Sequence, residues 1–257
     1  MIVSRQNQKI KDIRHLLRCK ADRAVLEGSH LVREGIAAGL QPEYVLATPD
    51  FLANPTSQDL VEAVGPSLSP VDPRLLEELT DADSPRGVLA VVSLSDRSLD
   101  SVPIAAGGVY LYLDGIQDPG NFGALVRAAE GLGATAVIAA PGCTHPNHPR
   151  ALRASAGSLL RTRPAVDVAV ADLREHLLSV SPTFVALVPR GGVPLQDLTF
   201  EDTQVFAVGA EGPGLSANVL QLADQRVTIP LISPVESLNT AVAAALVLYE
   251  CHRRDGR

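Results

Sequence analysis

Apolar runs alternate with amphipathic stretches through the second half of the chain. Five short runs rich in Val, Ile, Leu and Ala have the length of buried strands, at 109–113, 136–140, 183–188, 204–209 and 226–231. Stretches with helix-like patterning lie among them, at 121–132, 148–161, 172–178, 216–222 and 238–254. This alternation predicts a parallel sheet covered by helices on both faces.

The first 93 residues carry a smaller set of predicted elements. Apolar residues at helical spacing among basic ones predict a helix within 1–23. Strands are expected at 25–27, 44–47 and 87–93, and further helices at 29–39, 58–64 and 73–79. Ser29 is expected to cap the helix that Gly39 ends. The expected organisation is α/β throughout, with a small domain at 1–93, a Ser-, Asp-, Ala- and Gly-rich linker at 94–107 and a parallel-sheet domain at 108–257.

Composition narrows the class of protein. Of the 257 residues, 46% are hydrophobic and 20% charged, a balance typical of globular rather than disordered chains. No run of about 18 uncharged apolar residues is present, which predicts no membrane span, and the N-terminus lacks the apolar stretch of a secretory signal. Cys19, Cys143 and Cys251 are far apart without CxxC spacing, so we expect a reducing cytoplasm rather than disulfides or a zinc site.

Charge is distributed unevenly along the chain. The formal net charge is −7. Residues 1–23 hold seven basic and two acidic side chains, a net of +5, so the remainder carries −12. A basic arm on an acidic body is typical of a phosphate-contacting segment, and it equally fits a solvated helix face. The candidate contacts are Arg5, Lys9, Lys11, Arg14 and Arg18.

Three turns rich in Gly, Pro, Ser and Asn each join a predicted strand to a helix-like segment, at 113–127, 208–215 and 229–239. Open α/β sheets bind their ligands at the edge formed by the carboxyl ends of the strands. We therefore expect the three turns to converge at one site.

The first turn carries Asn121 and Arg127, six positions apart at the start of a predicted helix. If Asn121 caps this helix, its side chain lies near the site while Arg127 reaches back along the helix. The five fixed donors of an Arg suit a phosphate or a polarised hydroxyl. A structural Asn cap with a surface Arg fits the same pattern.

The second and third turns add further polar groups. Glycines from Gly209 to Gly214 permit positive φ and close backbone approach to a ligand, although neither a Walker loop nor a G-x-G-x-x-G fingerprint is present. Glu211 would repel a pyrophosphate, which favours a ligand with a cation or amines, or else a tight turn with a solvated Glu. In the third turn Ser237 and Asn239 can cap the following helix or bind a substrate.

Together, the order and content of the three turns resemble the three signature motifs of the SpoU (TrmH-like) RNA ribose 2′-O-methyltransferases of the SPOUT superfamily. The resemblance covers about residues 108–255, includes the segment Pro149–Leu159, and extends to 1–93, which is similar to the family's small substrate-binding domain. It implies an α/β fold with a deep trefoil knot, S-adenosylmethionine as cofactor, a homodimer, and methyl transfer to a ribose 2′-hydroxyl of RNA.

The resemblance also assigns roles to residues. It places Gly209, Ile229 and Leu238 where the family contacts the methyl donor, largely through backbone groups. It places Arg127 at the 2′-hydroxyl, with Asn121, Glu211, Ser237 and Asn239 around it as candidate catalytic residues, and it makes the basic arm a candidate RNA contact. An Arg is a poor base because its pKa exceeds about 12, so stabilising the developing alkoxide is the simpler role, with an RNA phosphate as proton acceptor. Ser233 and Thr240 depart from the family's common Gly and Val.

Other readings stay open from the sequence. Ribosomal RNA is favoured over transfer RNA as substrate because of the extra N-terminal domain. The rivals are an RNA-binding or ribosome-assembly protein without catalysis and, more weakly, a nucleotide-binding hydrolase. His145 and His148 have metal-like spacing without a third ligand, so no metal is expected. Residues 239–254 form either a dimer contact or part of one subunit's core.

Overall fold

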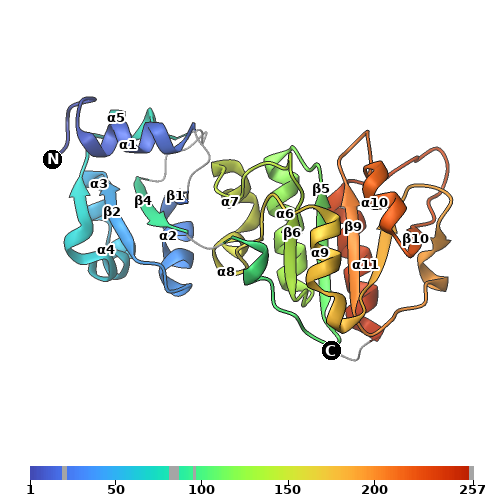
Figure 1. Ribbon diagram of the computed structural model, residues 1–257. Helices are drawn as coiled ribbons and strands as arrows, with labels where there is room; N and C mark the ends of the chain where they lie inside the picture. Colours follow the sequence, from blue (N-terminus) through green and yellow to red (C-terminus); the bar gives the residue numbers. More distant parts are fainter. Residues whose placement is uncertain (19–21, 81–86, 95–96, 255–257) are drawn as a thin grey trace. The chain divides into compact units, whose positions relative to one another are not determined.

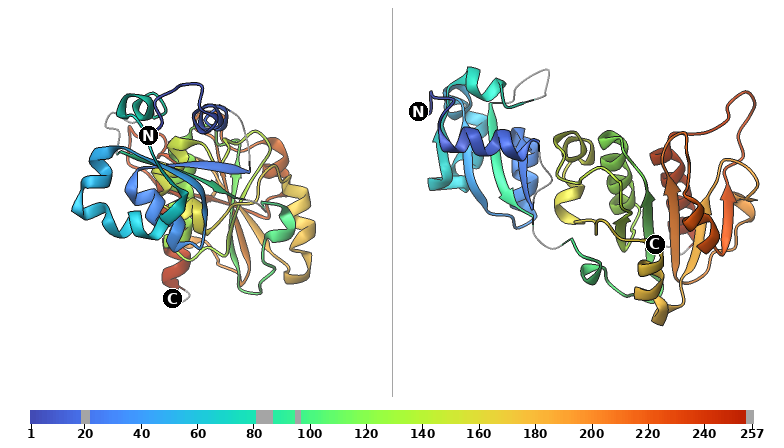
Figure 2. Two further views of the ribbon diagram at one scale, coloured as in Figure 1. Left: turned by 90° about the vertical axis from the view of Figure 1, so that its left-hand side faces the viewer. Right: turned by 45° about the horizontal axis from the view of Figure 1, so that its top comes forward.

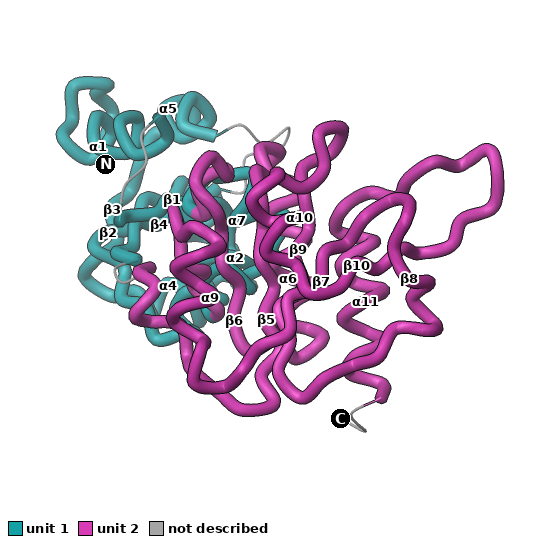
Figure 3. Tube along the Cα trace, turned by 45° about the vertical axis from the view of Figure 1, so that its right-hand side comes forward, with its two compact units in different colours: residues 1–95, 147–161 teal, residues 96–146, 162–257 magenta. Residues whose placement is uncertain are grey.

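The computed structural model describes residues 1–18, 22–80, 87–94 and 97–254, and Cys19 and residues 84–86 of the family resemblance lie outside them. The chain forms two compact units, which Figure 3 shows in different colours. The first comprises residues 1–95 and 147–161, and the second comprises 96–146 and 162–257. The expected domains were contiguous, so the membership of 147–161 in the first unit is a difference from the sequence-based division.

The first unit contains a four-stranded sheet in the order β1-β4-β2-β3 (Figure 1). β4 runs antiparallel to β1 and β2, whereas β3 pairs parallel to β2. The strands are β1 (Arg23–Glu27), β2 (Pro42–Ala47), β3 (Leu68–Pro70) and β4 (Val88–Ser93). The helices are α1 (Gln8–Leu16), α2 (Gly28–Ala37), α3 (Pro49–Ala53), α4 (Gln58–Val64) and α5 (Pro73–Glu77).

Helix α1 is held to this unit by its apolar side. Ile10 and Ile13 are fully buried in a cluster with Leu46 and Val91 of the sheet. Asn7 caps the helix, since its side chain accepts a hydrogen bond from the Lys9 backbone N–H at 3.0 Å. Of the basic residues of this helix, Lys11 is exposed, whereas Lys9 and Arg14 are partly buried.

Helix α2 begins one residue earlier than expected. Gly28 is its first residue and Glu27, the last residue of β1, occupies the cap position without a capping side-chain bond. The expected cap at Ser29 is therefore wrong, because the strand runs directly into the helix. The helix stops at Ala37, and Gly39 follows with a φ of 79°, as expected for a glycine that ends a helix.

The segment 147–161 forms two short helices, α7 (Pro149–Ser155) and α8 (Ser158–Arg161), rather than the single helix expected at 148–161. Ala156 and Gly157 take φ values of 47° and 97° between them, and this left-handed backbone ends α7. Both helices belong to the first unit, where α7 packs against β1.

Two ion pairs hold this segment within the first unit. Arg153 of α7 donates to Glu27 at 2.5 Å, and the Glu27 side chain is only 6% exposed. Arg161 of α8 pairs with Glu34 of α2. A buried carboxylate needs such a partner because its desolvation is costly.

The second unit contains a six-stranded sheet in the order β6-β5-β9-β7-β10-β8, with every neighbouring pair parallel. The strands are β5 (Val109–Asp114), β6 (Ala136–Ala139), β7 (Thr183–Leu187), β8 (Val193–Pro194), β9 (Gln204–Gly209) and β10 (Gln225–Thr228). The helices are α6 (Pro119–Gly131), α9 (Val170–His176), α10 (Ala217–Leu222) and α11 (Thr240–Arg254). The predicted parallel sheet is confirmed.

The helices of this unit cover both faces of its sheet. α6 packs against α11, and α9 against α10, and Figure 2 shows the two pairs on opposite sides of the strands. Of the elements expected here, the strand at 226–231 ends three residues early, and the short edge strand β8 was not expected. In the described residues, no helix combines the length and apolar character that crossing a membrane requires.

The Arg153–Glu27 pair yields a stability prediction. Arg153→Ala should lower the free energy of unfolding by about 3 kcal/mol, because it leaves a buried carboxylate without its cation. Urea unfolding of the full chain, followed by circular dichroism, measures the change. A second substitution, Glu27→Gln, should recover part of the loss by removing the charge, and a double variant no more stable than Arg153→Ala would contradict this account.

Candidate active site

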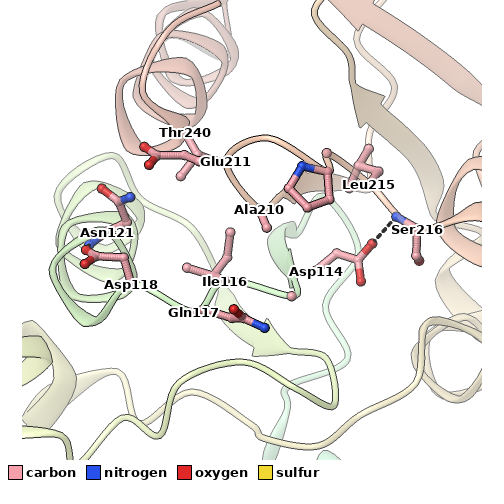
Figure 4. Close-up of a pocket in the computed structure, with 13 residues that line it drawn as sticks. Asp114, Ile116, Gln117, Asp118, Asn121, Ala210, Glu211, Leu215, Ser216 and Thr240 are labelled. Carbon is pink, nitrogen blue, oxygen red and sulfur yellow. Dashed lines mark hydrogen bonds between the residues drawn. The ribbon is translucent and has the colours of Figure 1, made fainter.

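The turns after β5 and β9 meet at the carboxyl edge of the sheet. These strands are direct neighbours, and Asp114 at the end of β5 pairs in register with Gly209 at the end of β9. The two turns line a cavity of about 540 Å³, the first cavity, to which Asp114, Gln117, Asp118, Asn121, Glu211 and Thr240 contribute (Figure 4).

Asn239 of the third turn joins the other two turns through its side-chain amide. Its Nδ2 donates to Asn121 Oδ1 at 2.9 Å and to Glu211 Oε1 at 2.8 Å. Its Oδ1 accepts from the backbone N–H groups of Ala241, at 2.9 Å, and Val242, at 3.4 Å. Asn239 therefore caps α11, one of the two roles left open by the sequence, and it also binds two side chains of the site; contact with a substrate stays a prediction.

Asn121 is not the cap of α6, contrary to the expectation. Asp118 is, since its Oδ1 accepts from the Asn121 backbone N–H at 2.8 Å. Pro119 then occupies the first helical position, where its missing N–H costs nothing. This shift of the helix start leaves the Asn121 side chain available to Asn239.

Arg127 lies two turns along α6 and is exposed. Among the described residues, it lines neither this cavity nor the one described next. The structure thus brings Asn121, Glu211 and Asn239 together without Arg127, and the assignment of Arg127 to the reacting hydroxyl stays a prediction.

The glycines of the second turn have two distinct functions. Gly212 and Gly214 take positive φ, 89° and 72°, as the tight turn requires. Gly209 does not, but a Cβ on it would lie 2.2 Å from the Gly214 carbonyl carbon. The chain thus passes within contact of itself at Gly209, and Thr240 Oγ1 donates to the Gly209 carbonyl at 3.1 Å.

A second cavity of about 670 Å³ adjoins the first and shares Ala210, Glu211, Gly214 and Thr240 with it. Gly209, Ile229 and Leu238, the predicted donor contacts, all line it, as does Ser237. Its size lies in the range of small-molecule sites. Apolar side chains from β7, β9 and β10 and the third turn supply walls for an aromatic ring. The carboxylate of Glu211 suits a cationic ligand, whereas Glu236 pairs at 3.2 Å with Arg190, which lines the same cavity. These residues fit S-adenosylmethionine, which carries an adenine, a sulfonium and an ammonium group.

The basic arm is partly neutralised within its own unit. Arg5 and Arg14 both pair with Glu78, Arg14 at 2.8 Å. Lys9 donates to Ser69 at 2.8 Å and lies over the ring of Tyr44 at 5.2 Å.

Two cations of the arm differ from these three. Lys11 and Arg18 are exposed and have no ion pair within the described part of the chain. Asp12, which lies between the basic residues, is bound by Arg23 at 2.7 Å, and the Arg23 guanidinium holds the pKa of that carboxyl below its usual value.

His148 and Cys143 have structural surroundings. His148 caps α7, its Nδ1 accepting from the Arg150 backbone N–H at 3.2 Å. The Cys143 thiol donates to the Leu113 carbonyl at 3.3 Å, and burial raises its pKa. No group of three or more potential metal-ligating side chains occurs among the described residues.

Sequence reasoning missed several residues that line the first cavity. Asp114 accepts from the Ser216 backbone N–H at 2.6 Å and so ties the end of β5 to the second turn. Gln117 lies between Asp114 and the predicted site residue Asn121 in the chain. Their position in the sequence could have indicated them, because Asp114 ends the buried strand β5 and Gln117 lies in the turn after it, at the edge where such sheets bind ligands.

Comparisons with known proteins agree with this geometry. The profile of the SpoU rRNA Methylase family matches residues 108–249, and that of the MRM3-like substrate binding domain matches residues 7–90. The chain belongs to the SpoU rRNA methylase family. The predicted family, the α/β fold class and the RNA methyltransferase class are thereby confirmed.

Family members with known names match nearly the whole chain. The 23S rRNA (guanosine(2553)-2′-O)-methyltransferase RlmP of Bacillus subtilis is 28% identical, over 96% of this chain and 97% of its own. The 23S rRNA (guanosine-2′-O-)-methyltransferase RlmB of Bordetella pertussis is 30% identical over 91% and 98%. The crystal structure of the SpoU methyltransferase AviRb from Streptomyces viridochromogenes, in complex with AdoMet, superimposes with a TM-score of 0.89 at 27% identity, over 97% and 98% of the two chains.

The Asn239 amide generates a prediction for this SpoU family site. Asn239→Asp keeps an acceptor for the α11 N–H groups but replaces the donor by a carboxylate facing Glu211. Methyl transfer to RNA should fall about 100-fold, since two hydrogen bonds are lost and like charges meet, with little change in thermal midpoint. Transfer of a tritiated methyl group measures the first and calorimetry the second. Asn218→Asp, on the exposed side of α10, is the control; equal activities of the two variants would refute the role of the amide.

Proposed function

We propose that this chain transfers a methyl group from S-adenosylmethionine to a ribose 2′-hydroxyl of ribosomal RNA in the cytoplasm. The observation that carries the proposal is the junction at Asn239, where all three family motifs meet between two adjoining cavities. Relatives of nearly equal length, RlmP and RlmB, act on 23S rRNA, which favours ribosomal over transfer RNA.

The residues of the second cavity would hold the methyl donor. When bound, S-adenosylmethionine supplies an electrophilic methyl group. Gly209, Ile229 and Leu238 would contact it, and the absence of a side chain at Gly209 leaves the backbone close to the ligand. Glu211 lies in the wall shared by both cavities, where its negative charge would attract a cationic ligand.

The acceptor hydroxyl would be positioned by side chains whose directions Asn239 fixes. Asn121 presents an amide to the first cavity, while Glu211 faces both. Because the two bonds from Asn239 hold these groups in place before substrate arrives, little ordering remains to be done on binding. Ser237, exposed in the third turn, is proposed as a further contact to the reacting nucleotide.

Arg127 is proposed to stabilise the alkoxide that develops as the 2′-hydroxyl loses its proton to an RNA phosphate. Because Arg127 is exposed on α6 and lines neither cavity, we propose that it takes this role only when a second copy of the chain is bound. α6 packs against α11, whose Val242, Leu246 and Tyr249 are 49%, 40% and 55% exposed at spacings of one helical turn. A second copy of the chain over this apolar stripe is the proposed homodimer, which sedimentation equilibrium would detect. The trefoil knot stays a prediction.

The rival reading is an RNA-binding protein of the same fold without catalysis. Titration of the full chain with S-adenosylmethionine by calorimetry separates the two, since no binding would favour the rival. Ribose methylations mapped in ribosomal RNA from cells with and without this chain then test the reaction: a site lost with the chain and restored by it in vitro is expected. An unchanged methylation map, with no transfer to unmodified ribosomal RNA in vitro, would refute the proposed function.

Arg127→Lys tests the role given to Arg127. The substitution keeps a positive charge but loses the planar array of donors, so turnover should fall about 100-fold with S-adenosylmethionine affinity unchanged. Single-turnover methyl transfer and calorimetry provide the two readouts. Arg226→Lys, at an exposed position of β10, serves as control. Near-normal turnover of Arg127→Lys would exclude an essential guanidinium.

The basic arm is proposed to contact RNA mainly through Lys11 and Arg18. Replacing both with Gln should weaken RNA binding and reduce the slope of log affinity against log salt by about 1 to 2, because up to two phosphate contacts are lost. Glu78→Gln should act in the opposite direction by releasing Arg5 and Arg14 from their ion pairs. Filter binding across a salt series measures both, and an unaltered slope in the double variant would place the RNA contact elsewhere.

A further inference from the structure

The first cavity is not explained by binding of the methyl donor. It adjoins the second cavity through a wall that includes Glu211 and Thr240, and its volume of about 540 Å³ lies in the range of sites for small ligands. An acceptor nucleoside must reach the donor from a neighbouring space, and enzymes that act on one nucleotide draw it out of its stack into a pocket.

The wall of this cavity is acidic. Asp114, Asp118 and Glu211 line it, and each is held in place by an N–H donor of the protein: Ser216 N at 2.6 Å, Asn121 N at 2.8 Å and Asn239 Nδ2 at 2.8 Å, respectively. Such a wall repels phosphate groups. It therefore suits the uncharged part of a nucleotide, and within it a base edge that carries N–H donors.

Gln117 completes the wall with an amide. Figure 4 shows its side chain between those of Asp118 and Asp114. The residue is exposed, and within the described part of the chain its amide makes no hydrogen bond. Among the described contacts, none assigns this amide a structural role. Its Nε2 can donate a hydrogen bond to a ligand and its Oε1 can accept one.

We propose that the first cavity receives the base of the target nucleotide and selects guanine there, Gln117 donating to O6 while Asp114 accepts from N1–H and the N2 amine. Guanine alone among the four bases has two adjacent donors beside an acceptor on its Watson–Crick edge. Uracil presents carbonyl oxygens on both sides of its single N–H, and adenine presents a bare N1, so each would meet the Asp114 carboxylate with a lone pair. Reading of an unstacked base along this edge is the usual mode of sequence-specific RNA recognition.

This inference rests on the proposed function, so its experiment begins with the wild-type chain. After the methylated position has been mapped, synthetic RNAs carry guanosine, inosine or 2-aminopurine riboside at that position. Inosine lacks the N2 amine that Asp114 would bind, whereas 2-aminopurine lacks O6 and N1–H. Wild-type kcat/KM should fall about tenfold or more with either analogue.

Gln117→Leu is the diagnostic variant, with Gln221→Leu, exposed on α10, as control. For guanosine RNA, Gln117→Leu should lower kcat/KM about tenfold. The penalty for 2-aminopurine should shrink in this variant, because the donor to O6 is already gone, while the penalty for inosine should stay as in wild type. S-adenosylmethionine affinity and thermal midpoint should not change.

Three outcomes would overturn the proposal. A target other than guanosine would refute base selection while leaving the proposed function intact. An equal loss on all three RNAs, or no loss, in Gln117→Leu would show that Gln117 does not read O6. A wild-type chain that methylates no RNA would remove the proposed function and this inference with it.

Discussion

One side-chain amide holds the candidate site together. Asn239 uses both of its amide hydrogens on side chains from the other two turns and its oxygen on the backbone that opens α11. Since the oxygen is committed to N–H donors, the orientation of the amide is fixed, and so are the directions of Asn121 and Glu211. Asn239 lies 118 positions from Asn121 and 28 from Glu211, so segments distant in the chain share one geometry, and the boundary between the two cavities depends on it.

Much of the second unit could be predicted from the sequence because a buried parallel strand is a short continuous run of apolar residues between turn residues. Residues 109–113 and 205–208 are continuous apolar runs, followed by Asp114 and Gly209, and their convergence follows from the geometry of parallel sheets. The start of α6 was misplaced because Asp118 and Asn121 are both good capping residues, and only Pro119 decides between them. Thr240, by contrast, carries no local sign that its hydroxyl binds the Gly209 carbonyl 31 positions away.

The net charge of residues 1–23 does not predict which of their cations are ion-paired in the fold. The arm carries five excess positive charges in the sequence, yet Glu78 alone engages two of its arginines. Contacts between residues 60 or more positions apart determine which cations are left to bind RNA. Such contacts depend on the fold and cannot be read from the order of charges in the sequence. Exposed pairs of this kind contribute little to stability, so their greater effect is on the field that an approaching RNA meets.

The excursion of residues 147–161 into the first unit affects how the protein can be divided. The chain passes between the units at three places in the sequence, and Leu152, Leu159 and Leu160 are fully buried. Cutting the linker near residue 100 would therefore not release an intact second unit: it would strip those leucines of their cover and expose them to water. The first unit is consequently not a detachable module, because a cut in the linker leaves part of it attached to the second unit.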